Sequence, residues 1–181
     1  MVPAVLILTL AWTLKSMTDS LGAAEYVSGV VASSASGLQM LLPAIIFVVA
    51  ALLAFATGTS WGTFGILIPI CIAVFPAAAP LRIISISACM AGAVCGDHVS
   101  PISDTTIMAS AGAECKHVHH VSSQLPYALT VAAVSFLTFV VAGFSQQLGI
   151  VACAAISWIF GIAMIFSALW VLKRIGARQH R

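Results

Sequence analysis

Two carboxylates enclose a short segment rich in hydroxyl groups in the second half of the chain. Asp97 and Asp104 mark its ends, and the segment with its flank also holds His98, Ser100, Pro101, Ser103 and Thr105. Hard cations prefer oxygen ligands, so these side chains suit a small cation such as Na+. A carboxylate in surroundings of low dielectric also binds protons more tightly than it does in water. One such group can therefore bind Na+ and H+ in turn, which is the minimum chemistry for exchanging the two ions.

The same segment predicts an interruption between two helices. Pro101 lacks a backbone donor and disfavours helix at the residue before it, so the preceding apolar helix is expected to break near Gly96. Ser103 or Asp104 is then placed to cap a short new helix over residues 105–111.

A simpler interpretation of the two carboxylates stays open. Asp104 would then be only a helix cap, and Asp97 would only pair with His98 at an interface. A carboxylate at the bilayer centre costs about 2.5–3.5 kcal/mol on insertion scales. This cost favours a functional role for both carboxylates.

A second group of hydroxyls, spaced by glycines, interrupts another apolar region. This hydroxyl cluster consists of Thr57, Gly58, Thr59, Ser60, Gly62 and Thr63. Glycine permits close backbone approach and positive φ, so the cluster predicts the tip of a re-entrant hairpin. On this interpretation Thr59, Ser60 and Thr63 are candidate ligands for the ion or substrate. The alternative is small-residue helix packing, in which Ser and Thr hydroxyls bond across helices.

Asp19 is a third candidate ligand, and it lies between Thr18 and Ser20. Two other roles for it are equally open. It is also placed to cap a helix before Leu21, or to lie at the interface as a charge beside Lys15.

Three histidines lie in the polar stretch 114–124: His117, His119 and His120. Histidine titrates near neutral pH, so a pH-sensing role is one interpretation. The preferred prediction is that these side chains are solvated in a loop.

The composition indicates an all-α integral membrane protein. The chain has 181 residues, of which 61% are hydrophobic and only 7% charged, whereas soluble domains carry about 25% charged residues. The apolar surface must therefore face lipid. The net charge of +2 is too small to suggest nucleic acid as a partner. The five cysteines form no CxxC pair, so neither a disulfide framework nor a zinc site is expected.

Two segments match the length of about 20 apolar residues that a bilayer-spanning helix needs. Residues 125–144 and 150–172 are joined by a short polar turn, which predicts an antiparallel pair. We expect residues 1–172 to form the transmembrane part of a multi-pass cell-membrane protein. Residues 173–181 are expected to form a basic cytoplasmic tail, because Lys and Arg beside a final span favour the cytoplasmic side.

The earlier apolar segments are interrupted by Gly, Ser, Thr and Asp clusters rather than ended by long loops. Irregular backbone at membrane depth persists only where protein or a water-filled cavity surrounds it. Discontinuous helices of this kind build midplane ion sites in secondary transporters. The pattern therefore favours an ion-coupled secondary transporter that works by alternating access.

Several motifs, taken in order, resemble the NhaC-type Na+/H+ antiporters. They are Gly58-Thr59-Ser60-Trp61-Gly62-Thr63-Phe64-Gly65, Gly96-Asp97-His98 with residues 100–106, Ser123-Gln124-Leu125-Pro126-Tyr127-Ala128-Leu129 and, more weakly, Ala11-Trp12-Thr13-Leu14. The resemblance spans nearly the whole chain but only the C-terminal half of such an antiporter.

The resemblance implies two inverted repeats, each with a re-entrant hairpin and a broken helix, of which this chain holds one. On this pattern the hydroxyl cluster looks like the hairpin tip, and the segment from Asp97 to Asp104 looks like the helix break. Together with the oxygen chemistry above, Asp97, Asp104, Ser103 and Thr59 are then the candidate Na+ ligands. Na+ and H+ are expected as the transported ions, and no cofactor is expected. The family includes ion-coupled exchangers of organic acids, so the substrate stays open. A polypeptide carrying the N-terminal half, or a second copy of this chain, is then an expected partner.

Two other classes of protein share some of these sequence features. An intramembrane aspartyl protease with a GxGD motif would need glycine where Val94 stands, and no HExxH zinc motif occurs, so we do not expect an enzyme. A non-transporting subunit or truncated product would share every motif described above, and this alternative stays open.

Overall fold

The described part of the chain is entirely helical. The computed structural model describes residues 13, 17, 20–21 and 36–179, and no strand occurs in those residues. The helices are α3 (Ser36–Thr57), α4 (Ser60–Val74), α5 (Pro80–Val99), α6 (Asp104–Gly112), α7 (His117–Ser145), the 3-10 helix η1 (Gln146–Leu148) and α8 (Ile150–Gln179). The prediction of an all-α protein is confirmed for this part.

Four helices in the described ranges are long and apolar enough to cross a membrane. Their candidate spans are Gln39–Thr57, Pro80–Val99, His117–Leu148 and Ile150–Arg174. Helix α4 is also apolar, but its 15 residues measure about 22 Å, which is less than the hydrocarbon core of about 30 Å. The re-entrant hairpin and the inverted repeat stay predictions.

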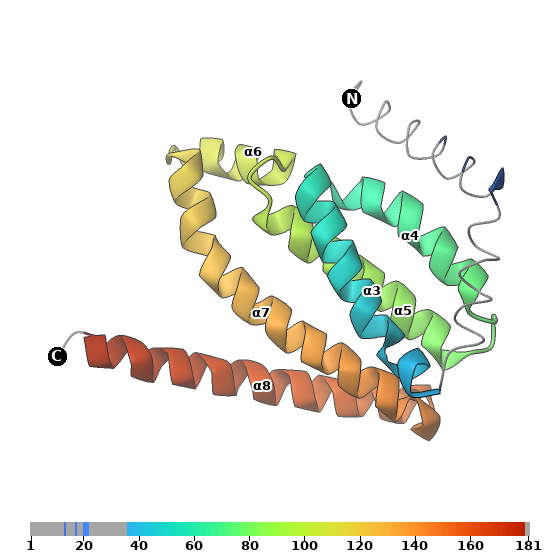
Figure 1. Ribbon diagram of the computed structural model, residues 1–181. Helices are drawn as coiled ribbons and strands as arrows, with labels where there is room; N and C mark the ends of the chain where they lie inside the picture. The colour runs from blue at the N-terminus through green and yellow to red at the C-terminus, as the bar shows by residue number, and fades with distance from the viewer. Residues whose placement is uncertain (1–12, 14–16, 18–19, 22–35, 180–181) are drawn as a thin grey trace.

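Helices α3, α4 and α5 form a three-helix unit (Figure 1). Helix α3 packs most extensively on α5. Helix α4 runs back from the end of α3 towards the start of α5 (Figure 1). Helix α7 lies across α3 and α5, and α8 packs back on α7 after η1. The antiparallel pair predicted at the end of the described chain is present.

Close backbone packing joins α3 to α5. Gly92 and Gly96 lie one turn apart on α5, and a Cβ at either would overlap a backbone carbonyl of α3, that of Phe47 or Ala51. This is the small-residue spacing that lets membrane helices approach. The hydrophobic core beside it contains small buried residues: Ala50, Ala54, Cys71, Cys89 and Ala93.

The expected break near Gly96 is wrong by about one turn. Helix α5 continues through Gly96 to Val99, and the chain leaves helical geometry at Ser100. The reason is that Gly96 serves helix packing, whereas Pro101 interrupts the backbone. Helix α6 begins at Asp104, close to the predicted start.

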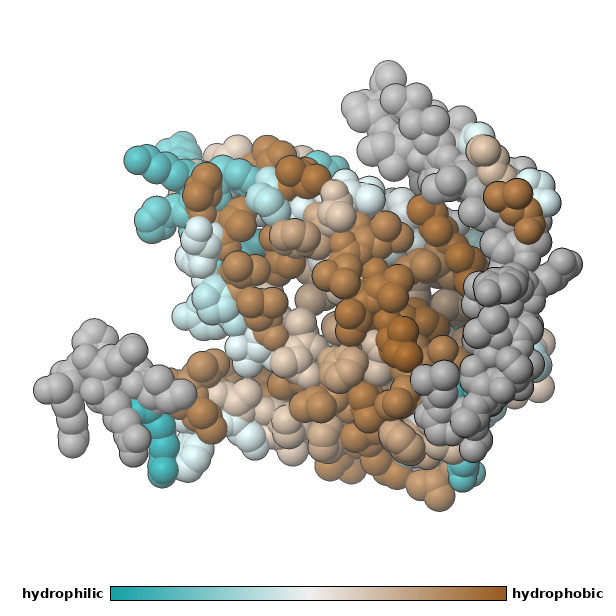
Figure 2. All heavy atoms as spheres, viewed as in Figure 1, coloured by the Kyte–Doolittle hydropathy of each residue, from teal (hydrophilic) through white to brown (hydrophobic). Residues whose placement is uncertain are grey.

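Helix α7 begins well before the predicted span. The polar stretch expected to be a loop over residues 114–124 is helical from His117 onward. Hydrophilic side chains gather at the corner where α6 meets α7, and apolar side chains cover most of the rest of the same face (Figure 2). This corner therefore marks one polar end of an apolar molecule.

Candidate functional site

Asp97 and Ser103 form a buried pair at the helix break. The Ser103 hydroxyl donates to Asp97 Oδ1 at 2.6 Å, with Asp97 8% exposed and Ser103 fully buried. The Oγ atom of Ser103 also lies 2.7 Å from Thr105 Oγ1. Since the Ser103 proton is given to the carboxylate, Thr105 must donate to Ser103. The arrangement is a line of three oxygens that starts at a carboxylate.

The helix ends explain why these side chains meet. Asp97 lies in the last turn of α5, and Ser103 is the residue that precedes α6. Pro101 turns the chain so that both lie at the same break. The carbonyl end of α5 carries partial negative charge, and the amide end of α6 carries partial positive charge, so the two helix ends oppose one another at the break. The carboxylate of Asp97 is therefore the group at this place that can attract a cation.

Ser100 fixes the break to α3. Its fully buried hydroxyl donates to the carbonyl oxygen of Phe55 at 2.8 Å, and the amide of Ile102 lies 3.4 Å from the same Ser100 oxygen. Ser100 was predicted as an ion ligand. In the structure its hydroxyl proton is committed to a backbone carbonyl of the neighbouring helix.

The hydroxyl cluster meets the break through its glycine. Gly58 follows α3 with φ +68°, and a Cβ there would lie 2.9 Å from the carbonyl oxygen of Ile102. Thr63 and Ser60 are buried, and the Thr63 hydroxyl donates to the Thr59 carbonyl at 3.1 Å. Among the hydrogen bonds of the described residues, none joins this cluster to Asp97. The cluster is adjacent to the break, but a direct ligand role for its hydroxyls stays a prediction.

Asp104 differs from Asp97 in its surroundings. Its side chain is exposed, and Oδ1 accepts the amide N–H of Thr105 at 2.8 Å in the first turn of α6. A carboxylate is favourable at this end of a helix. The residue that precedes α6 is Ser103, so Asp104 is the first residue of this helix rather than its cap. No hydrogen bond among the described residues links Asp104 to the buried pair of Asp97 and Ser103, and a ligand role for Asp104 stays a prediction. Asp19 lies outside the described residues.

Side chains that the sequence analysis missed also meet the break. The carbonyl oxygen of His98 accepts from Gln124 Nε2 at 2.6 Å and from Thr106 Oγ1 at 3.1 Å. His117 Nε2 lies 2.7 Å from the carbonyl oxygen of Pro101. The prediction that His117 is solvated in a loop is wrong, because it is the half-buried first residue of α7. Gln124 belongs to the third motif that resembles the antiporters, so the sequence contained a signal that could have identified it as a residue near the site.

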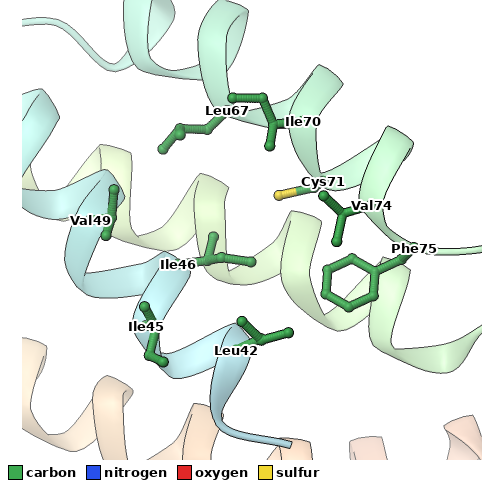
Figure 3. A pocket seen from close by; sticks show the side chains of 9 residues that line it. All are labelled: Leu42, Ile45, Ile46, Val49, Leu67, Ile70, Cys71, Val74 and Phe75. Atoms are coloured by element: carbon green, nitrogen blue, oxygen red, sulfur yellow. The ribbon is translucent and has the colours of Figure 1, made fainter. Parts of the chain in front are cut away.

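Two hollows are lined by neither Asp97 nor Ser103. The first is a cavity of about 120 Å³ between α3 and α4, where apolar side chains of the two helices face one another (Figure 3). None of its nine lining side chains carries nitrogen or oxygen, so this cavity does not suit an ion. The second is an open crevice of about 550 Å³ between α5 and α7. It has four polar residues in its lining: His98, Gln124, Tyr127 and Ser135.

The described residues contain no group of three or more His, Cys, Asp or Glu side chains placed to hold a metal ion.

Comparison with known proteins gives one family. A family model described as the Na+/H+ antiporter family matches residues 1–144. A Haemophilus influenzae protein of uncharacterised function is 48% identical over 145 residues, which is 80% of this chain and 28% of that protein. No solved structure matches.

Two relatives with named activities match at lower identity. The malate-2H(+)/Na(+)-lactate antiporter of Bacillus subtilis is 32% identical over 60% of this chain. The arginine/ornithine antiporter ArcD of Halobacterium salinarum is 32% identical over 62% of this chain. Each match covers 24% of the relative, so the chain spans about a quarter of the length of these proteins. The expected correspondence to a C-terminal half stays a prediction.

Proposed function

The chain belongs to the Na+/H+ antiporter family, and from this membership we propose that it provides the ion-binding carboxylate of an ion-coupled secondary transporter. The observation that carries the proposal is the buried pair of Asp97 and Ser103. A buried carboxylate that accepts a single hydroxyl donor keeps oxygen lone pairs free for a small cation, or for the proton that the cation replaces.

Asp97 is the exchange site in this proposal. The Ser103 hydroxyl occupies Oδ1 at 2.6 Å, and none of the hydrogen bonds in the described part of the chain involves Oδ2. A proton leaves Oδ2 as Na+ binds there, so net charge at the carboxylate is conserved through the exchange. Thr105 extends the line of oxygens from Ser103. Thr59 and Asp104 are retained as further proposed ligands from neighbouring segments.

The rest of the transporter is expected to complete the site. The relatives are about four times longer than their matched segments. Inverted-repeat transporters bind ions where two repeats meet. We therefore propose that a second polypeptide or a second copy of this chain covers the open side of the break. Na+ and H+ are substrates in this scheme, and no cofactor is involved.

A second candidate function is ion-coupled exchange of organic acids. The crevice between α5 and α7 favours it, because polar groups there lie in an otherwise apolar lining, as in small-molecule sites. The named relatives exchange carboxylates that bear a hydroxyl or amino group on the next carbon. In the crevice, the substrate carboxylate would contact His98, which follows Asp97 in α5, and Gln124 on the neighbouring helix α7.

Reconstituted liposomes test both functions. Na+-driven proton flux is measured for wild-type protein, Asp97→Asn and Asp104→Asn, each with and without the polypeptide that supplies the remaining length. We expect Asp97→Asn to reduce flux at least tenfold and Asp104→Asn to reduce it less. Unchanged flux in both variants would rule out the ion site. Flux that requires added malate, lactate or a basic amino acid would select the organic-acid function, and no flux under any condition would favour a non-transporting subunit.

A further inference from the structure

Two backbone carbonyls at the helix break are held by side chains from α7. The last carbonyls of an α-helix have no partner within the helix. At the end of α5, the His98 carbonyl accepts from Gln124 Nε2 at 2.6 Å. Within the break itself, the Pro101 carbonyl lies 2.7 Å from His117 Nε2. A carbonyl oxygen only accepts, so His117 Nε2 is the donor in this contact.

The spacing of the two donors explains how one helix reaches both carbonyls. Residues 117 and 124 are seven apart on α7, which is close to two turns, so their side chains project from the same face. We name these two side chains the α7 brace. Among the hydrogen bonds of the described residues, these are the two that side chains from beyond α6 donate to the break and the end of α5. A third long-range bond runs from the Ser100 hydroxyl to the Phe55 carbonyl of α3.

Helix α6 ties into the same contacts. Its Thr106 hydroxyl donates to the His98 carbonyl at 3.1 Å, beside Gln124. Its Ser110 hydroxyl lies 3.1 Å from His117 Nδ1. The ends of α5, α6 and α7 are therefore joined at two points, on either side of the loop that presents Ser103 to Asp97.

We propose that His117 and Gln124 are positioning residues, which hold the break so that Ser103 stays within hydrogen-bond distance of Asp97. The effect of this positioning on ion binding rests on the proposed function. If only a fraction of molecules has a formed break, the apparent ion affinity falls by that fraction. Loss of the brace is thus expected to lower the apparent affinity for Na+ and to leave the maximal rate of the folded transporter unchanged.

Hydrogen exchange of the complete protein in lipid nanodiscs tests the brace without any transport assay. The informative amides are those of Ser103 and Ile107, which bond to Ser100 and Ser103 carbonyls. We expect His117→Leu and Gln124→Leu to speed their exchange about tenfold. His117→Gln, which keeps a donor near the position of Nε2, and His119→Leu, the same change at an exposed neighbour, should stay within twofold of wild type.

Unchanged exchange in both Leu variants would overturn the brace, as would equally fast exchange in His117→Gln. His117→Leu is then assayed in liposomes, where we expect the KM for Na+ to rise about five- to tenfold at unchanged maximal rate per folded molecule, with His119→Leu as its control. Faster exchange with an unchanged KM would overturn the positioning role. The expected exchange pattern with no Na+ flux in wild type would sink the proposed function while leaving the brace supported.

Discussion

Burial separates the two carboxylates that the sequence presents as equivalent. Asp97 is nearly enclosed and receives the Ser103 hydroxyl, whereas Asp104 is exposed and accepts a backbone amide of its own helix. A hydrogen bond to a buried charge contributes more than one at the surface, because water does not compete for it. At the residue scale the ion-binding proposal therefore depends on Asp97 far more than on Asp104.

The Ser103 hydroxyl gives a residue-scale prediction. Ser103→Ala removes a hydrogen bond to a charged group, which typically contributes about 1.5–3 kcal/mol. We expect the half-saturating Na+ concentration for flux to rise at least tenfold. Ser167→Ala is the matched control, because within the part of the chain that the structure describes this exposed hydroxyl bonds only to the Ala163 carbonyl of its own helix. Equal Na+ dependence in the two variants would contradict the role given to Ser103.

Packing of α3 on α5 positions the break at the scale of elements. Gly92 and Gly96 bring the two backbones together, and the Ser100 hydroxyl joins the end of α5 to the Phe55 carbonyl of α3. The turn at Gly58 then lies against Ile102. Two interruptions that are far apart in sequence become neighbours because the helices that carry them pack in register.

Gly96→Ala tests this packing directly. The added methyl would overlap the Ala51 carbonyl, and overpacking of this kind typically costs about 1–3 kcal/mol. We expect a lower midpoint in thermal unfolding of the detergent-solubilised protein. Gly112→Ala is the control, because a Cβ there meets nothing within 4 Å. A midpoint lowered equally by both substitutions would mean that close approach of α3 and α5 is not what Gly96 provides.

At the scale of the whole molecule, two long helices define a polar end. Helix α8 has 30 residues and α7 has 29, so each measures about 45 Å and exceeds the hydrocarbon core. The excess at the end of α8 carries Lys173 and Arg174, and the Arg174 guanidinium lies 3.6 Å from the centre of the Trp170 ring. Because α7 and α8 are antiparallel, the start of α7 and the end of α8 belong to the same side of the membrane.

We propose that this side is cytoplasmic, as the basic residues indicate. A cysteine placed at residue 179, in a background with Cys115 replaced by Ser, is expected to react with a membrane-impermeant maleimide in inside-out vesicles and at least tenfold less in intact cells. A cysteine in place of exposed Gln147, at the opposite end of α8, should show the reverse. Labelling of both from the same side would contradict the topology.

The sequence by itself determined the membrane class, the helical composition and the presence of a break between two helices. These follow from apolar run lengths and from the backbone chemistry of Pro101, which act over a few residues. The displaced prediction at Gly96 shows the limit, because a glycine can end a helix or pack one, and only its neighbours decide which.

Tertiary structure alone decided which carboxylate is buried and what holds the break. Ser100 and Phe55 are 45 residues apart, and Gln124 and His98 are 26 apart. Burial of a side chain is a property of all the elements packed around it, so Asp97 and Asp104 cannot be told apart from their local sequence. The seven-residue spacing of His117 and Gln124 on α7 brings both side chains to the break only because α7 packs against the end of α5.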